Sequence, residues 1–128
     1  MNGILVCDDE IDTHLFIEAA LERYGVFEIT DAWNGRQAIE KAEKNQPDLI
    51  IMDFKMPDMD GFEALKEIQK TANIPAIMLT GMNLDPGIKQ DMIPYIVEYL
   101  VKPFAIDRLL DIIATYLKKL PDLAWVEK

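Results

Sequence analysis

Five short apolar runs recur along the chain, and a segment with helical spacing of apolar positions follows each of them. Continuous apolar runs bounded by polar residues are typical of strands buried on both faces of a parallel sheet. The pattern therefore predicts five strands, of which the second is the weakest, at residues 4–7, 27–32, 49–53, 75–79 and 97–101.

The segments between these runs carry the start and stop signals of helices. Asn34 with Gln37 resembles a capping box, and Asp85-Pro86 is a plausible cap followed by a first helical residue. We expect Pro94 to end the fourth helix at or before Ile93. The predicted helices cover residues 11–24, 35–44, 61–71, 86–93 and 106–117.

The first helix stops at Gly25, and its apolar residues suggest one buried side. His14, on the same helix, is expected to face solvent. The residues expected on the buried side are Ile11, Leu15 and Ala19, with Phe16 and Ala20 beside them.

Strand and helix alternate throughout with short connections, which predicts an α/β fold of five βα units. Connections between parallel strands are almost always right-handed, and helices must cover both faces of a sheet whose strands are apolar throughout. The expected architecture is a doubly wound, five-stranded parallel sheet. A chain of 128 residues fits one such domain.

Polar residues of a particular kind follow four of the strands. Asp8 and Asp9 follow the first, and Asp53 ends the third. Thr80 follows the fourth strand and Lys102 the fifth. The carboxyl ends of parallel strands share one edge of the sheet, where open α/β sheets place their sites. Carboxylates, a hydroxyl and an ammonium group at this edge suit a divalent cation and the receipt of a phosphoryl group.

Composition narrows the classes of function. The net charge is −10 and Lys and Arg form no cluster, so direct binding to nucleic acid or to a membrane surface is not expected. Cys7, the only cysteine, lies in an apolar run and is interpreted as a small buried hydrophobe. The sequence shows neither a signal peptide nor an apolar stretch of the roughly 20 residues that span a bilayer, so a cytoplasmic protein is expected.

Four segments follow one another along the chain at the ends of predicted strands: Val6–Glu10, Met52–Gly61, Leu79–Gly81 and Tyr99–Phe104. Together they resemble the receiver (REC) domain of bacterial two-component response regulators. The similarity spans residues 1–120, and residues 121–128 are expected to be a tail or the start of a linker. The resemblance implies a flavodoxin-like (βα)5 fold with strand order 2-1-3-4-5.

The resemblance assigns roles to the acidic residues. Asp53 matches the phosphorylated aspartate, which takes a phosphoryl group from a sensor histidine kinase or a phosphotransfer protein. The transfer needs Mg²⁺ to neutralise charge, and Mg²⁺ prefers oxygen ligands with several waters retained. Asp9 matches the direct ligand, and Asp8 a ligand that acts through water. Asp53 and the backbone carbonyl of Lys55 complete the set.

Three further matches concern the response to phosphorylation. Lys102 matches the lysine that pairs with Asp53 and then with a phosphoryl oxygen. Thr80 matches the hydroxyl that hydrogen-bonds the phosphoryl group, and Tyr99 the aromatic residue that moves in behind it. The expected switch is a two-state element controlled by a local change in charge. The resemblance also implies a cis peptide bond between Lys102 and Pro103.

Two residues close to the matched positions concern the lifetime of the acyl phosphate. We hypothesise that Lys55 lies over it and hinders an attacking water, while Met82 offers no acid or amide to orient that water. Both features predict a long-lived phosphorylated form. The alternative is that Lys55 pairs with Asp58 or Asp60 at the surface, which is worth about 0–1 kcal/mol.

The chain departs from the family before the fifth strand, where a small Gly-Ala pair is usual and Met92–Val97 stands instead. Bulky residues there affect the face of the fourth helix, fifth strand and fifth helix, which is commonly the output or dimer surface. Tyr95 and Ile96 either form an exposed contact patch or fill the core, and we favour the core. Because receiver dimers often form only after activation, a homodimer on activation is among the expected partner states.

A phosphorylation-controlled switch is therefore expected, rather than an enzyme acting on a separate substrate. One alternative is a Mg²⁺-dependent phosphatase or phosphotransferase with an aspartyl nucleophile, of the haloacid-dehalogenase-like kind. Such proteins place the nucleophile after the first strand with a second Asp two residues on, a spacing that the adjacent pair Asp8-Asp9 does not match. A second alternative, a degenerate receiver that only binds partners, is disfavoured by the full acidic set with Thr80 and Lys102. The kinase, the downstream target and the regulated process stay open.

Overall fold

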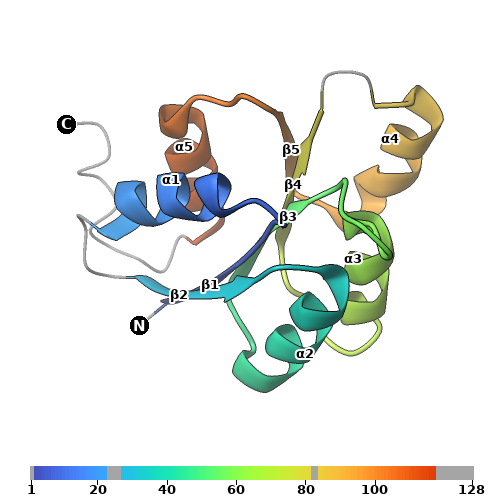
Figure 1. The fold of residues 1–128 in the computed structure, drawn as a ribbon, viewed down its shortest axis with the longest axis horizontal. Helices are drawn as coiled ribbons and strands as arrows, with labels where there is room; N and C mark the ends of the chain where they lie inside the picture. The colour runs from blue at the N-terminus through green and yellow to red at the C-terminus, as the bar shows by residue number, and fades with distance from the viewer. Residues whose placement is uncertain (1, 23–26, 82–83, 118–128) are drawn as a thin grey trace.

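One parallel sheet forms the centre of the molecule (Figure 1). The structure is a computed structural model that describes residues 2–22, 27–81 and 84–117. The strands are β1 (Asn2–Cys7), β2 (Phe27–Ala32), β3 (Leu49–Asp53), β4 (Ala76–Thr80) and β5 (Glu98–Val101). They pair in parallel in the order β2-β1-β3-β4-β5, which confirms the predicted fold class and strand order.

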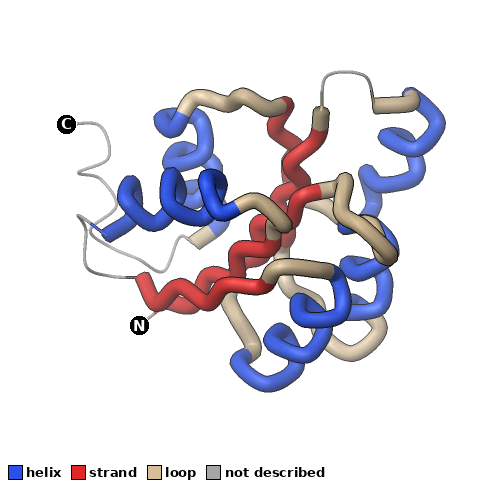
Figure 2. The backbone as a smooth tube through the Cα atoms, viewed as in Figure 1, coloured by secondary structure: helices blue, strands red, loops and turns tan. Residues whose placement is uncertain are grey.

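Helices cover both faces of the sheet. They are α1 (Ile11–Glu22), α2 (Gly35–Asn45), α3 (Gly61–Gln69), α4 (Pro86–Met92) and α5 (Ile106–Tyr116), with a 3₁₀ turn η1 (Ile93–Tyr95) after α4. α1 and α5 lie on one face, and α2, α3 and α4 on the other (Figure 1, Figure 2). The predicted order of elements is confirmed, and the boundaries differ only at the ends.

Alternation along the strands divides the core into two layers. In β1, Ile4 and Val6 belong to the layer beneath α1 and α5, whereas Leu5 and Cys7 belong to the layer beneath α2, α3 and α4. Every residue of β3 and β4 is buried, as a continuous apolar run predicts. Asp53 and Thr80 are the last residues of β3 and β4, so these two polar side chains lie at the carboxyl edge of the sheet.

The buried side of α1 differs from the prediction. It consists of His14, Ile17 and Leu21, which are spaced at i, i+3 and i+7. His14 was expected in solvent and is 1% exposed. Apolar residues lie on both sides of this helix, so spacing alone does not decide which side is buried. The residues expected to be buried are instead exposed or half-buried: Ile11, Leu15, Phe16, Ala19 and Ala20.

The start of α2 follows the predicted cap with one change of partner. The side chain of Asn34 accepts the backbone N–H of Gln37 at 2.8 Å. The Gln37 side chain accepts the N–H of Trp33 at 2.9 Å, one residue before the expected partner. The cap thus closes around the turn that joins β2 to α2.

The segment around α4 confirms two interpretations. Asp85 caps α4 with Pro86 as its first residue, and the helix ends before Pro94, as predicted. Tyr95 and Ile96 are half-buried and pack against the core layer beneath α3. They therefore fill the core rather than forming an exposed patch.

Some predictions concern residues outside the described ranges, namely the stop at Gly25, Met82, and the tail at 121–128. In the part of the chain that the structure describes, no helix combines the length and apolar character needed to cross a bilayer.

Gly61 brings the start of α3 directly against the end of β3. Its N–H donates to the carbonyl of Phe54 at 2.8 Å, and a reciprocal capping box between Asp60 and Glu63 fixes the first turn. A Cβ at Gly61 would lie 2.2 Å from the carbonyl oxygen of Asp53 and 2.8 Å from the Cγ of Met52. Only glycine fits this close approach.

We predict that Gly61→Ala destabilises the protein by about 3 kcal/mol, because the backbone behind Asp53 must shift to make room. Urea unfolding measures the change. Gly81→Ala is the control, since no atom beyond its chain neighbours lies within 4 Å of its added Cβ, and it should change stability by less than about 0.5 kcal/mol. Equal effects of the two substitutions would contradict the argument.

Candidate functional site

The carboxyl edge of the sheet gathers the polar residues that the sequence predicted to meet there. Asp8 is 0% exposed, Asp53 5% and Thr80 1%. Parallel pairing between the strands sets their positions, with Asp53 opposite Leu79 and Thr80 opposite Val101. Burial of two carboxylates at neighbouring strand ends is costly unless other groups compensate their charge.

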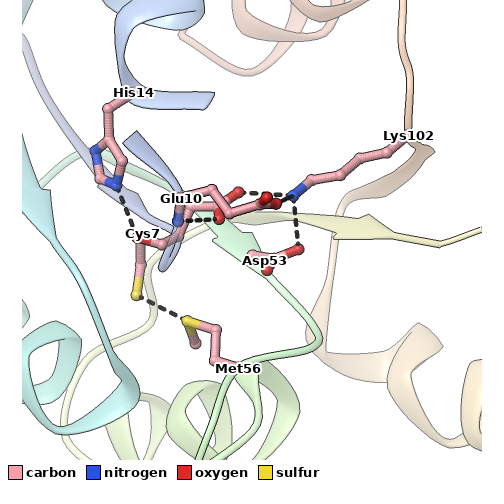
Figure 3. Close-up of polar contacts among 7 residues, drawn as sticks. Cys7, Glu10, His14, Asp53, Met56 and Lys102 are labelled. Atoms are coloured by element: carbon pink, nitrogen blue, oxygen red, sulfur yellow. Dashed lines mark hydrogen bonds and ion pairs between the residues drawn. The ribbon is translucent and has the colours of Figure 1, made fainter. Parts of the chain in front are cut away.

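Lys102 supplies that compensation. Its Nζ lies 2.7 Å from Oδ2 of Asp8 and 3.1 Å from Oδ1 of Asp53, and Glu10 is 3.9 Å away (Figure 3). Its backbone N–H donates to the carbonyl of Thr80 at 2.8 Å, and its peptide bond to the following proline is cis, as the resemblance implies. The pairing with Asp53 is as the resemblance implies, whereas the shorter contact with Asp8 was not foreseen.

The charges at this edge are unbalanced. Burial, and next the negative charge of Asp8, raise the pKa of Asp53 to about 6, although Lys102 acts in the opposite direction. Burial alone would lower the pKa of Lys102, but its hydrogen bond to Asp8 and the charge of Asp53 raise it overall. The single ammonium group of Lys102 therefore does not fully compensate the burial of Asp53 and the negative charge around it.

A group of carboxylates at the start of α1 could hold a cation. Ligand oxygens of Asp8, Asp9 and Glu10 lie within 4.8 Å of one another, with Asp8 buried and the other two exposed. Carboxylate oxygens are hard ligands that suit Mg²⁺. The raised pKa of Asp53 indicates a local excess of negative charge that a divalent cation would relieve. The donor set therefore fits Mg²⁺, with Glu10 as a candidate that sequence reasoning had not named.

The residues expected to act after phosphorylation lie near this edge. Tyr99 is half-buried on β5, and the Nζ of Lys89 lies 4.4 Å above the centroid of its ring. Lys55 is exposed, and no ion pair joins it to Asp58, Asp60 or another carboxylate of the described residues. The surface pair proposed as the alternative role of Lys55 is thus not present among the described residues, and both roles stay predictions.

Cys7 lies directly before the acidic pair and is fully buried, as predicted. Its Sγ is 3.6 Å from the Sδ of Met56 (Figure 3) and also 3.4 Å from the carbonyl oxygen of Asn34. Burial and the negative charges of Asp8 and Asp53 raise the pKa of the thiol to about 12. The thiol is therefore a packing group and not a nucleophile.

An apolar hollow opens beside the acidic edge. Phe16 and Phe104 meet edge to face, with ring centroids 5.7 Å apart. The hollow lies between the start of α1 and the segment after Lys102, and its lining is Glu10, Asp12, Thr13, Phe16, Lys102, Pro103 and Phe104. Exposed aromatic surface next to a buried polar site is suited to contact with another protein.

The sequence has close relatives among signalling proteins. The response regulator receiver domain matches residues 4–114. The chain is 37% identical over 111 residues to the chemotaxis protein CheY of Bacillus subtilis, covering 86% of this chain and 92% of that protein. It is 31% identical over 124 residues to the transcriptional regulatory protein PdtaR of Mycobacterium tuberculosis, covering 97% of this chain but only 60% of the relative.

Solved structures show the same similarity. The receiver domain of the Francisella response regulator 1452 superimposes with a TM-score of 0.82 at 30% identity, covering 93% of this chain and 98% of that one. A two-component response regulator from Clostridium difficile superimposes with a TM-score of 0.84 at 27% identity, covering 95% of this chain and 100% of that one. The fold and the order of its elements are thus shared with these proteins.

The charge imbalance predicts a pH-dependent gain of stability in Asp53→Asn. The native pKa of about 6 lies above the ordinary value of 3.8, so ionised Asp53 destabilises the folded state above pH 6 and costs nothing below 3.8. In the presence of a chelator at neutral pH, the variant should be more stable than the parent by about 1–3 kcal/mol. The gain should shrink as the pH falls through 6 and disappear near 3.8.

Urea unfolding at a series of pH values measures this gain. Asp58→Asn is the matched control, because Asp58 is an exposed carboxylate with φ of 69°, a conformation that Asn tolerates. It should show no such gain. A stabilisation by Asp53→Asn that is constant across the pH range would contradict the electrostatic explanation.

Proposed function

This chain belongs to the response regulator receiver domain family, and on that premise we propose that Asp53 is the phosphoacceptor of a two-component signalling switch. The observation that carries the proposal is the position of Asp53, which is buried at the end of β3, contacts Lys102 and lies close enough to Asp8 and Asp9 for their negative charge to raise its pKa. The relatives of this chain are signalling regulators, which favours the switch over a phosphatase.

In the proposed reaction, an oxygen of Asp53 attacks the phosphorus of a phosphohistidine on a sensor kinase or a phosphotransfer protein. The new oxygen–phosphorus bond forms as the phosphorus–nitrogen bond breaks, and the donor histidine departs with the electron pair. Lys102 already contacts Asp53 and would follow a phosphoryl oxygen. Ionised Asp53 is the reactive form, so the contacts that oppose its protonation also favour the reaction.

Asp8, Asp9 and Asp53 are the proposed magnesium ligands, with the backbone carbonyl of Lys55 as a fourth. Mg²⁺, when bound, neutralises charge on the transferring phosphoryl group. Asp8 is already oriented by Lys102 and by the backbone N–H of Glu10, which lies 2.9 Å from its Oδ1. The carboxylate of Asp8 is thus held in place by protein groups.

Thr80 and Tyr99 form the proposed switch. A phosphoryl group on Asp53 would draw the hydroxyl of Thr80 inward, and the loop after β4 would move with it. Tyr99 would then exchange its contact with Lys89 for the space left behind Thr80. The cation–π contact supports this proposal because it holds the ring in one defined position before phosphorylation.

The phosphodonor would dock on the exposed side of α1 and the apolar hollow beside it. Ile11 is 59% exposed and Leu15 55%, and both lie on the helix that follows the acidic residues. A donor seated there would bring its histidine next to Asp53. Ile11 and Leu15, which were expected to be buried, would therefore contribute apolar contacts to the phosphodonor.

The face formed by α4, β5 and α5 is the proposed output surface, where the phosphorylated protein binds its downstream partner. Ile88, Ile93 and Val101 are exposed there. A downstream protein, or a second copy of this chain after activation, would bind this face. Like the family generally, the protein is proposed to act in the cytoplasm and not as an enzyme on a separate substrate.

Asp53→Asn should abolish phosphorylation. Parent and variant are incubated with Mg²⁺ and acetyl phosphate, and intact mass spectrometry measures the fraction carrying one phosphoryl group. The parent and Asp58→Asn, the matched control in the next turn, should be labelled to the same extent. Labelling of Asp53→Asn to the level of the parent would refute the proposal, as would a failure of the parent to form a beryllofluoride adduct.

Lys55→Ala should shorten the life of the phosphorylated form several-fold, because the cation no longer hinders the attacking water. Loss of the phosphoryl group is followed by mass after the donor is removed. Lys44→Ala, which removes an exposed lysine from the last turn of α2, is the control and should leave the rate unchanged. An unchanged rate in Lys55→Ala would count against a role in lifetime.

A further inference from the structure

His14 has no role in the proposed reaction, yet its side chain is buried and has two polar partners. Its Nε2 lies 2.8 Å from the backbone carbonyl oxygen of Asp8 (Figure 3). Its Nδ1 lies 2.6 Å from Oδ1 of Asp31 on β2. Its ring stacks on Trp33, with centroids 3.8 Å apart. A single side chain therefore links α1 to the ends of β1 and β2.

The chemistry of the two contacts fixes the direction of one of them. A backbone carbonyl can only accept a hydrogen bond, so Nε2 must carry the hydrogen and donate it to Asp8. Nδ1 faces a carboxylate, which holds the ring in this orientation. The buried imidazole is thus aimed at the peptide group of a proposed metal ligand.

Every polar group of Asp8 has a partner in this arrangement. Its N–H donates to the carbonyl of Ala32, and its carboxylate accepts from Glu10 and Lys102. The remaining group, the carbonyl, accepts from His14. Since β1 ends at Cys7, the backbone of Asp8 lies beyond the strand, and His14 is the side chain that holds it there.

We propose that His14 is a positioning residue of the magnesium site, which fixes the peptide of Asp8 so that its carboxylate faces the cation. This inference rests on the proposed function, because it requires Asp8 to act in metal binding. Partners that hold a metal ligand in place are typically important for affinity even though they do not touch the ion.

Two isosteric substitutions separate this role from a merely structural one. In His14→Gln the amide nitrogen reaches the position of Nε2 and keeps the donor to Asp8. In His14→Asn it reaches the position of Nδ1 and keeps only the contact with Asp31. Isothermal titration with Mg²⁺ alone measures affinity for each variant.

We expect His14→Asn to weaken Mg²⁺ binding about tenfold and His14→Gln to stay within about twofold of the parent. Ile17→Ala is the control for general destabilisation, because Ile17 is buried on the same side of α1. It should lower the midpoint of urea unfolding while leaving Mg²⁺ affinity unchanged.

Affinity of His14→Asn equal to that of the parent would overturn the inference, as would equal losses in the Asn and Gln variants or a matching loss in Ile17→Ala. In each of these cases the parent still binds Mg²⁺, so the proposed function survives. A parent that binds no Mg²⁺ would overturn both.

Discussion

The contact of one ammonium group with two buried carboxylates is the constraint on which the site depends. Parallel pairing of β1 with β3 brings Asp8 and Asp53 to adjacent positions at the edge of the sheet. Like charges so close would repel each other strongly in a buried environment. Lys102 reaches both from beyond β5, at the far end of the sheet order. The repulsion between Asp8 and Asp53 is therefore compensated only when β1, β3 and β5 are all in place.

The sequence was sufficient to predict the sheet because its central strands are uniformly apolar, and such runs have few other structural solutions. The strand-end residues followed from topology alone, since parallel strands deliver their carboxyl ends to one edge. The buried side of α1 could not be predicted in this way. Its apolar residues occupy two sides of the helix, and burial of His14 depends on Asp31, a partner seventeen residues away. A signal existed in the i, i+3, i+7 spacing of His14, Ile17 and Leu21, but hydrophobicity scales discount a histidine.

Two other features of the site show the same limit. The contact of Lys102 with Asp8 spans 94 positions of sequence and depends on the path of the segment after β5. Glu10 adds a carboxylate to the metal group because the chain turns between Asp8 and the start of α1 at Ile11. Family resemblance assigns roles to matched positions, but it does not show which neighbours share the charge. Distances between side chains were needed for that.

The burial of Cys7 has a practical consequence. It is the only cysteine in the chain, and its thiol is both inaccessible and resistant to ionisation. A cysteine introduced at an exposed position would therefore be the single point of attachment for a fluorophore or spin label under native conditions. The wild-type background needs no thiol removed, so a probe on α4 could report conformational exchange in an otherwise unaltered molecule.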